Sequence, residues 1–421
     1  MSAFKFIHSS DLHIDSPIKG LKSRDPIVGK KVEVASYQAL DNLVELCKQE
    51  EADFLLIAGD AFDSDNPSVF ARLKLQDALQ SLAEAGIHSY IVRGNHDPLT
   101  GRPDSVEYPP EAHFFGTDIQ WMNHEREGEV IAQIQGVSYS KRDVTDNLAA
   151  DFTMPPDSSV FSIGLLHCNL GGNAAHANYA PCSISDLAQK AIEYWALGHI
   201  HKWDVVPHQA MTVAYSGNIQ GRDIGEPDER GCLVVEVEES GHSEPRFKAL
   251  DVIRWKHIPV PIDGLTTIDA LRDAIIDELR AAQSAADGRD VICRVTLTGR
   301  GELHTELNSS QNITDLEILV REEFDLLSSS PWIWLERIKV NTRPDIDIDL
   351  RMEQDDFLGE VLKSAHSASL EDLDPMLSEV FSDRADRRPK LTEDEVADLQ
   401  QEAITYLIDL LEPGAQSGAS G

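Results

Sequence analysis

Short apolar runs that end in polar residues dominate the first part of the chain. The run Phe4–Ser9 leads to Asp11 and His13, and the run 55–59 (Leu-Leu-Ile-Ala-Gly) leads to Asp60. Runs of this length that end at Gly and an acidic residue are typical of buried strands closed by tight turns. The pattern therefore predicts strands with polar side chains at their carboxyl ends, the edge where open α/β sheets bind ligands.

Helical periodicity separates these strands. Between 33 and 50, apolar residues such as Tyr37, Leu40 and Val44 recur at intervals of three and four, which predicts an amphipathic helix. A second helix is expected to end at Gly86, before another strand. The resulting β-α-β-α-β order favours an α/β fold, in which a sheet is covered by helices.

After residue 110 the chain changes to short strand-like runs with few helices between them. These runs lie at 119–122, 130–139, 160–166, 194–197, 212–215 and 232–237. We expect them to form a second, more antiparallel sheet that packs against the first.

Three further regions follow a first domain expected at 1–253. Residues 254–350 alternate predicted helices and strands, which indicates a small α+β capping domain. Residues 351–413 are polar and helical in pattern, and the Gly/Ser-rich segment 414–421 is typical of a disordered tail.

Composition restricts the class of protein. With 37 basic and 73 acidic residues the formal net charge is −36, so the surface as a whole repels nucleic acid and membranes. Salt confines that repulsion to roughly 8–10 Å, and a local cationic site can still bind a phosphate. No apolar run approaches the ~20 residues that span a bilayer, and the N-terminus lacks a signal-peptide pattern. The five scattered cysteines have no Cys-x-x-Cys spacing, which predicts a reduced, cytoplasmic protein.

Five predicted strand ends carry residue types that bind metals. They are Asp11-x-His13, Asp60-x-x-Asp63, Asn95-His96-Asp97, His167 and His199-x-His201. Because residues i and i+2 of an extended strand share a face, Asp11 and His13 can converge on one point. Carboxylate, amide and imidazole donors without a thiolate suit ions such as Mn²⁺ or Fe²⁺. The motifs therefore predict one metal site assembled from distant parts of the chain.

In this order, the five motifs resemble those of the calcineurin-like metallophosphoesterase superfamily. The resemblance implies a four-layer α/β/β/α sandwich and two divalent metal ions, with Mn²⁺ as the expected ion. One ion would be held by Asp11, His13, Asp60 and His201, and the other by Asp60, Asn95, His167 and His199. It also implies that His96 protonates the leaving oxygen or stabilises the transition state, and that Asp63 pairs with His96.

A narrower resemblance is to the SbcD-type DNA repair exonucleases, particularly their YhaO-like branch. Residues 6–13 are similar to the opening motif of that group, and residues 215–222 to the loop after its last metal motif. Position 63 departs from the archaeal and eukaryotic relatives, which carry His where this chain has Asp63. The resemblance implies hydrolysis of DNA phosphodiesters together with an SbcC-like (YhaN-like) coiled-coil ATPase, and a homodimer is also compatible with it.

Arg222 lies in the turn Gly221-Arg222-Asp223, in the loop that follows His201. One interpretation is a surface arginine. The other is a contact to a substrate phosphate, because the loop is expected to return to the edge of the sheet that carries the metal site.

The C-terminal region contains the capping box Thr392-x-x-Glu395 and an apolar stripe after it. The stripe comprises Val396, Leu399, Ala403, Tyr406 and Leu410. A shorter helix is expected from Asp374 to Phe381. These helices either pack on the capping domain or bind the ATPase, and their position after two complete domains favours the ATPase.

Other functions stay open. A nucleotide phosphodiesterase or a phosphoprotein phosphatase would use the same metal ligands, although Ser64 and Asp65 after Asp63 depart from the phosphatase motif. A metal-free protein-binding scaffold of the same fold is the third possibility. It fits less well because each expected ligand position holds a residue that can bind a metal.

Overall fold

A computed structural model of the chain describes residues 2–16, 25–99, 106–172, 177–208, 211–324, 331–345, 348–367, 403–404, 406–408 and 411. The chain divides into two compact units. The first comprises Met1–His257, Ala281–Cys293 and Phe324–Trp334, and the second Ile258–Arg280, Arg294–Glu323 and Leu335–Gly421. Because each unit is built from several chain segments, the domain boundaries expected from the sequence stay predictions.

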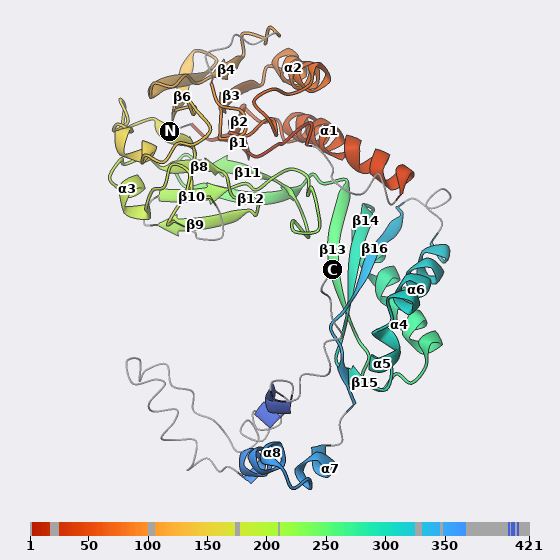
Figure 1. Cartoon of the computed structure of the whole chain (residues 1–421). Helices are drawn as coiled ribbons and strands as arrows, with labels where there is room; N and C mark the ends of the chain where they lie inside the picture. The colour runs from red at the N-terminus through yellow and green to blue at the C-terminus, as the bar shows by residue number, and fades with distance from the viewer. Residues whose placement is uncertain are drawn as a thin grey trace. The chain divides into compact units, whose positions relative to one another are not determined.

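Two six-stranded sheets form the framework of the described part of the first unit (Figure 1). The first sheet has the order β12-β11-β1-β2-β3-β4. Its strands are β1 (Phe4–Ser9), β2 (Phe54–Ala58), β3 (His88–Val92), β4 (Ala112–Phe114), β11 (Gly231–Val237) and β12 (Ser243–Ala249). Strands β1 to β4 run parallel, whereas β11 pairs antiparallel with both β1 and β12.

The second sheet has the order β5-β6-β7-β8-β10-β9. Its strands are β5 (Gln120–Arg126), β6 (Glu129–Gly136), β7 (Phe161–His167), β8 (Tyr194–Gly198), β9 (Asp204–His208) and β10 (Met211–Tyr215). The expectation of a more antiparallel sheet is wrong, because β6, β7, β8 and β10 run parallel and only the edge strands β5 and β9 are antiparallel. Some of the short segments between these strands are crossovers that join parallel strands. The alternation of apolar and polar residues identifies a strand but not its direction, so the sequence could not distinguish these crossovers from hairpins.

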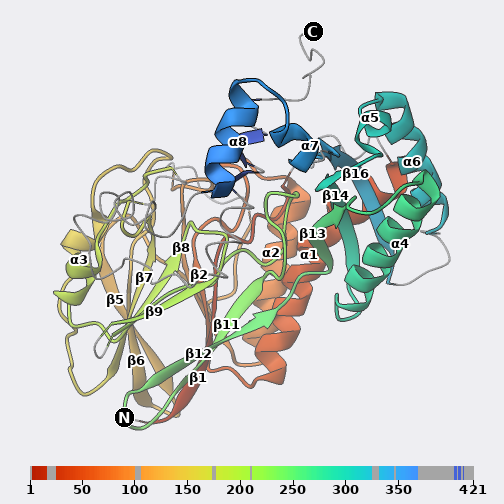
Figure 2. The ribbon, with the colours of Figure 1, turned by 90° about the horizontal axis from the view of Figure 1, so that it is seen from below.

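Three buried apolar clusters separate four layers. On β2, Leu55 and Ile57 pack against α1 (Pro26–Gln49) and α2 (Val69–Glu84) on the outer face of the first sheet. The alternate residues Phe54 and Leu56 face the second sheet. The outer face of the second sheet packs against η1 (Leu148–Asp151) and α3 (Ile184–Ala188), and Figure 2 shows α3 on the opposite side of the two sheets from α1 and α2. The expected α/β/β/α sandwich is therefore confirmed.

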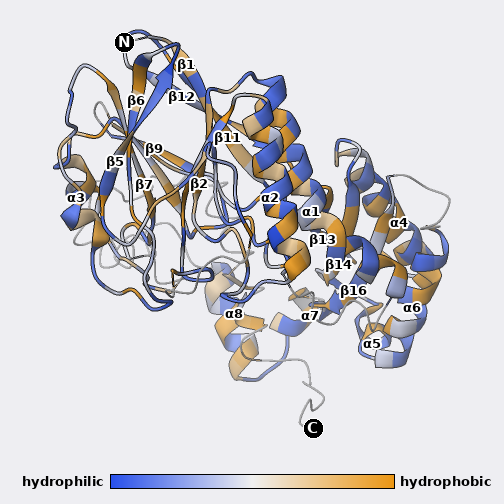
Figure 3. Ribbon diagram, turned by 90° about the horizontal axis from the view of Figure 1, so that it is seen from above, coloured by the Kyte–Doolittle hydropathy of each residue, from blue (hydrophilic) through white to orange (hydrophobic). Residues whose placement is uncertain are grey.

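Local sequence explains where the two long helices begin. The Asp25 side chain accepts hydrogen bonds from the N–H groups of Ile27 and Val28, with Pro26 at the first helical position. Ser68 caps α2 in the same way through the N–H of Ala71. Each helix buries one face and exposes the other, which gives the mixed hydrophobic and hydrophilic colouring of α1 and α2 in Figure 3.

The remaining elements include a three-stranded sheet, of order β13-β14-β16. The strands are β13 (Ile253–Pro261), β14 (Asp290–Thr298) and β16 (Ile333–Val340), and the helices that follow β13 and β14 are α4 (Ile268–Ser284), α5 (His304–Leu307) and α6 (Ser310–Glu322). A two-stranded sheet joins β15 (Arg300–Gly301) and β17 (Arg343–Pro344).

The chain ends with helical segments of the second unit. Helices α7 (Ile348–Met352) and α8 (Phe357–Ser367) are followed, after a gap in the described residues, by helical residues near 403–411. The expected capping box and the helix from Asp374 to Phe381 lie outside the described residues. Ile404 and Ile408 are buried against α8, whereas Ala403 and Tyr406 of the predicted stripe are exposed.

None of the helices among the described residues is long and apolar enough to cross a bilayer.

Candidate metal centre

The predicted ligand residues lie together where strands of both sheets end. Asp11 and His13 follow β1, Asp60 follows β2, His167 ends β7 and His201 follows β8. Donor atoms of Asp11, His13 and His201 lie within 4.8 Å of one another, and so do those of Asp11, Asp60 and His167. The same holds for His13, Asp60 and His96. The structure thus brings into one cluster residues that are up to 190 positions apart in the sequence.

Glycines beside the motif residues allow this close approach. A Cβ atom on Gly59, whose φ is +94°, would lie 2.5 Å from Nδ1 of His167. A Cβ on Gly94 would lie 2.3 Å from Oδ1 of Asp60. Both distances are shorter than any Cβ contact in a real protein. Side chains at these two positions would therefore displace the groups that form the centre.

His167 turns one ring nitrogen toward two side-chain oxygen atoms. Its Nδ1 lies 2.9 Å from the carbonyl oxygen of Ala58, to which it donates a hydrogen bond, so Nε2 carries a lone pair. That Nε2 lies 3.0 Å from Oδ1 of Asn95 and 3.5 Å from Oδ2 of Asp60. With His167 neutral and Asp60 ionised, these three atoms are all electron-pair donors, and this arrangement fits a metal ion.

A second group of donors contains His13 and His201, whose facing ring nitrogens can share one proton. Their Nε2 atoms are 3.1 Å apart, and Nδ1 of His201 donates to Oε1 of Glu226 at 2.6 Å, which leaves Nε2 of His201 with a lone pair. Nε2 of His13 lies 3.8 Å from Oδ2 of Asp60 and 3.9 Å from Oδ1 of Asp11. The buried carboxylate of Asp60 therefore borders both groups of donors.

The carboxyl groups of the centre are crowded. Burial, together with the charges of Asp97 and Asp11, raises the pKa of Asp60 well above its usual value. Burial also disfavours the ionised form of Asp11, but the positive charge that His201, His167 and His13 have when protonated outweighs that effect and lowers the pKa of Asp11 to about 2. Divalent cations would stabilise the ionised carboxylates of both Asp11 and Asp60, which agrees with the donor groups gathered around them.

His199 is placed differently from the other predicted ligands. Its ring centre lies 5.4 Å from that of His167, but it belongs to none of the three donor groups found among the described residues. Its Nε2 donates to the carbonyl oxygen of Ala177 at 2.9 Å, so Nδ1 is the nitrogen that carries a lone pair. Burial lowers the pKa of His199 to about 4, which keeps the ring neutral near pH 7.

The expected pairing of His96 with the Asp63 carboxylate stays a prediction, since the two groups are neighbours without a direct hydrogen bond. Nδ1 of His96 donates to the backbone carbonyl oxygen of Asp63 at 2.9 Å, whereas the carboxylate Oδ1 is 3.8 Å away. That carboxylate is instead 3.0 Å from Nδ1 of His13 and accepts a hydrogen bond from Arg222. The Asp63 carboxylate therefore adjoins His13, His96 and Arg222 at the same time.

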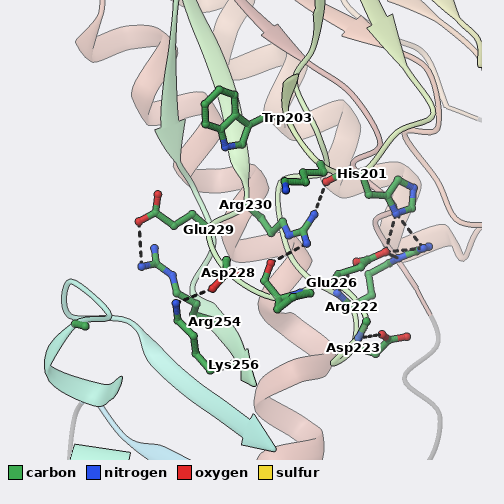
Figure 4. Close-up of a pocket in the computed structure, with 14 residues that line it drawn as sticks. His201, Trp203, Arg222, Asp223, Glu226, Asp228, Glu229, Arg230, Arg254 and Lys256 are labelled. Carbon is green, nitrogen blue, oxygen red and sulfur yellow. Dashed lines mark hydrogen bonds and ion pairs between the residues drawn. The ribbon is translucent and has the colours of Figure 1, made fainter. Parts of the chain in front are cut away.

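The expected phosphate contact of Arg222 also stays a prediction, and its guanidinium lies among carboxylates. Nη1 donates to Asp63 at 2.9 Å. Nε and Nη2 donate to Oε1 of Glu226 at 3.2 and 3.0 Å, and Figure 4 shows this second pair. The guanidinium thus bonds two carboxylates of its own chain. The Nε2 atoms of His13 and His201 face each other, and their Nδ1 atoms point outward. Arg222 links these two Nδ1 atoms, because it bonds Asp63 beside His13 and Glu226 beside His201.

Sequence reasoning gave no role to two residues of this arrangement. Asp97 accepts hydrogen bonds from the N–H groups of Gly94 and Ala61 at 2.9 and 3.0 Å, which ties together the turns after β2 and β3. Glu226 is held by His201 and Arg222, and although burial opposes its ionisation these partners keep its pKa well below the usual range. The position of Asp97 directly after His96 was a signal for a role at the site. Glu226 belongs to no motif, so the sequence contained no such signal for it.

Comparisons with known proteins agree with this geometry. Residues 4–203 match the family model for calcineurin-like phosphoesterases, and residues 255–343 match the middle domain of metallophosphoesterase YhaO. The chain is 30% identical over 407 residues to the uncharacterized metallophosphoesterase YhaO of Bacillus subtilis (strain 168), with 96% of each protein covered.

Two nucleases are more distant relatives. The DNA double-strand break repair protein Mre11 of Sulfurisphaera tokodaii is 26% identical over 48% of this chain and 50% of that protein. The SbcD component of nuclease SbcCD from Bacillus subtilis (strain 168) is 24% identical over 51% of this chain and 61% of that protein. Among solved structures, a dimetal phosphatase from Danio rerio aligns at 13% identity over 57% of this chain and 94% of that chain, with a TM-score of 0.35, a likeness too distant to bear on function. Because its similarity to the Bacillus YhaO protein extends over nearly the whole length of both, the chain belongs to the calcineurin-like metallophosphoesterases and, among them, to the YhaO family.

Proposed function

We propose that the protein is a two-metal phosphodiesterase that hydrolyses DNA, as a repair exonuclease that works with an SbcC-like coiled-coil ATPase. The observation that carries the proposal is the buried carboxylate of Asp60 between two groups of donors, 3.8 Å from Nε2 of His13 and 3.5 Å from Nε2 of His167. Asp11, His13, Asp60 and His201 would hold one ion, and Asp60, Asn95, His167 and His199 the other. Two bound divalent ions, with Mn²⁺ proposed, would polarise the phosphoryl oxygens and make bound water acidic.

His96 supplies the proton to the leaving oxygen in this proposal. Because Nδ1 of His96 donates to a backbone carbonyl, the ring presents Nε2 on its other side. In the imidazolium form Nε2 carries the proton that the leaving alkoxide needs. The carbonyl of Asp63 therefore orients the ring without adding a negative charge of its own.

The choice of DNA rests on the relatives rather than on the metal donors. The two nucleases each match about half of this chain, and the same donors would also serve a phosphomonoesterase or a nucleotide phosphodiesterase. Purified protein with Mn²⁺ can be compared on linear duplex DNA, bis-p-nitrophenyl phosphate and p-nitrophenyl phosphate. We expect hydrolysis of both diesters and little of the monoester. Preference for the monoester would contradict the proposal.

A partner surface is proposed for the helical segments at the C-terminal end. Large apolar side chains are exposed there: Leu350 by 61%, Phe357 by 75%, Tyr406 by 66% and Leu411 by 42%. Apolar side chains exposed to this degree favour contact with another protein. Binding of the ATPase here would also give an acidic protein a basic surface for DNA.

A further inference from the structure

A pocket of about 840 Å³ lies beside the metal centre, within the first unit. His201 forms part of its wall, together with Lys202 and Trp203 from the same loop. The loop between β10 and β11 contributes residues 222–230, and β13 contributes Arg254 and Lys256 (Figure 4). Because one wall is a proposed metal ligand, a molecule in this pocket would adjoin the reacting phosphate.

The charges that line the pocket are mostly paired within the protein. Five basic and four acidic side chains line it, a balance that contrasts with the excess of acids over bases in the whole chain. Lys256 pairs with Asp228 at 2.7 Å, and Arg254 with Glu229 at 3.2 Å. Lys202 is the exception, since it makes no hydrogen bond or ion pair with any residue that the structure describes. This lysine is available for a phosphate.

Arg230 supports the same wall from within the protein. It is 7% exposed, and its Nη2 donates to the carbonyl oxygen of Pro227 at 2.8 Å. Its Nη1 bonds the carbonyl oxygen of His201 and so holds the loop that carries Lys202. The Nε atom of Arg230 is buried and has no acceptor among the described residues. Arg230 therefore fixes the loop that carries Lys202 and Trp203 and leaves Lys202 as the group available to a ligand.

Trp203 is an aromatic platform at this pocket. Its side chain is 42% exposed, and one face stacks on Phe247 with ring centres 5.1 Å apart and planes 17° from parallel. Gly217, with φ of +74°, lets the neighbouring loop approach so closely that a Cβ there would lie 2.8 Å from the backbone nitrogen of Trp203. The indole is thus held in place before any ligand binds. Preorganisation of this kind lowers the entropy cost of stacking.

We propose that this pocket is a nucleotide subsite, in which Trp203 stacks on a base next to the scissile phosphate and Lys202 contacts the phosphate of that nucleotide. The inference rests on the proposed function. Trp203 follows His201 by two residues, so their Cα atoms are at most about 7 Å apart, which is about the rise of two nucleotides along a strand. Stacking on an aromatic ring tolerates every base, as an enzyme that degrades DNA of any sequence requires.

The first test compares two replacements of the indole in the full-length protein. Trp203→Ala is expected to raise KM for single-stranded DNA about tenfold, the scale of one stacked base, and by much more than it changes KM for bis-p-nitrophenyl phosphate. Trp203→Phe keeps an aromatic face and is expected to restore most of the affinity for DNA. An equal change with both substrates, or an Ala variant with unchanged KM for DNA, overturns the subsite.

The second test separates Lys202 from general electrostatics. Lys202→Ala is expected to reduce the dependence of log KM for DNA on log salt concentration by about one unit of slope. Lys30→Ala removes an exposed lysine from α1 and serves as the matched control, with an unchanged slope. Equal slopes for the two variants overturn the phosphate contact.

Binding without catalysis distinguishes failure of the subsite from failure of the proposed function. Trp203 is the most exposed of the six tryptophans, so a thymidine tetranucleotide added in EDTA is expected to quench tryptophan fluorescence in the wild type and much less in Trp203→Ala. Quenching without any hydrolysis of DNA supports the subsite and contradicts the nuclease proposal. Hydrolysis of DNA without quenching supports the nuclease proposal and overturns the subsite.

Discussion

Arg222 donates a hydrogen bond to the carboxylate of Asp63, with 2.9 Å between Nη1 and Oδ1. The pair joins the turn after β2 to the loop after β10, which are 159 residues apart in the sequence. The same guanidinium also bonds Glu226. Asp63 lies beside Nδ1 of His13, and Glu226 accepts a hydrogen bond from Nδ1 of His201. We infer that Arg222 sets the distance between these two histidines.

Replacement of Arg222 should weaken metal binding at one of the two sites. Lysine keeps the charge but lacks the planar fork that bonds both carboxylates at once. We expect Arg222→Lys to lower the Mn²⁺ affinity of the site that contains His13 and His201 by ~10–100-fold, and to leave the site with His167 nearly unchanged. Titration calorimetry of the metal-free protein measures both affinities.

Arg246→Lys is the matched control for this variant, because Arg246 of β12 pairs with a single exposed carboxylate, that of Glu236 on β11. Its metal affinities should equal those of the wild type. If Arg222→Lys instead left both affinities intact and raised KM for DNA, the phosphate contact first expected from the sequence would be supported.

His96 should act in turnover rather than in metal binding. The structure places it in one donor group with His13 and Asp60, so a role as a ligand is a real alternative. We expect His96→Ala to retain the wild-type metal content and to lower kcat by ~10²–10⁴-fold, the usual contribution of a general acid. Metal analysis beside steady-state kinetics checks both; loss of metal from the variant would reassign His96 as a ligand.

The pH dependence of stability should include a contribution from His124. Burial lowers the pKa of this side chain to about 4, whereas an unfolded histidine has a pKa of about 6.5. Between these values the unfolded chain binds a proton that the folded protein excludes. The free energy of unfolding should therefore fall as the pH decreases from about 6.5 to about 4, by up to ~1.4 kcal/mol per pH unit from this residue.

Urea unfolding in EDTA at pH 7 and pH 5 measures this contribution. We expect His124→Gln to reduce the loss of stability between the two pH values, while replacement of the exposed His242 by Gln leaves it unchanged. Identical losses in His124→Gln and the wild type would show that His124 is protonated in the folded protein.

Much of the fold was predictable because its signals are local. Apolar runs marked β1, β2 and β7, and the motif residues followed them directly, so the convergence of Asp11, Asp60 and His167 could be expected from strand order. The direction of strands in the second sheet could not, because β6 and β7 pair across a segment that resembles the other short connections. The partners of Arg222 were also beyond the sequence, since one guanidinium can bond a phosphate or two carboxylates equally well.

The C-terminal stripe illustrates the same limit. A period of 3.6 identifies an apolar face but not the surface that covers it. Ile404 and Ile408 pack on Leu358 and Leu362 of α8, and Tyr406 of the predicted stripe stays exposed. Neighbouring helices, rather than periodicity, decide which face is buried.

Tyr406 therefore offers a test of the proposed ATPase contact. We expect Tyr406→Asp to keep the thermal midpoint of the wild type and to reduce co-purification with the coiled-coil ATPase. Ile404→Asp, at a buried position two residues earlier, should instead lower the midpoint because it places a charge in an apolar cluster. Undiminished co-purification of the Tyr406→Asp protein would exclude this side chain from the interface.

The most direct measurement of the central claim is release of nucleotides from end-labelled linear duplex DNA by the purified protein. The account predicts release that requires Mn²⁺, stops in EDTA and is lost in Asp60→Asn, because Asp60 borders both donor groups. Release that persists in EDTA or in Asp60→Asn, or its complete absence in a wild-type protein that binds two Mn²⁺ ions, would contradict a two-metal nuclease.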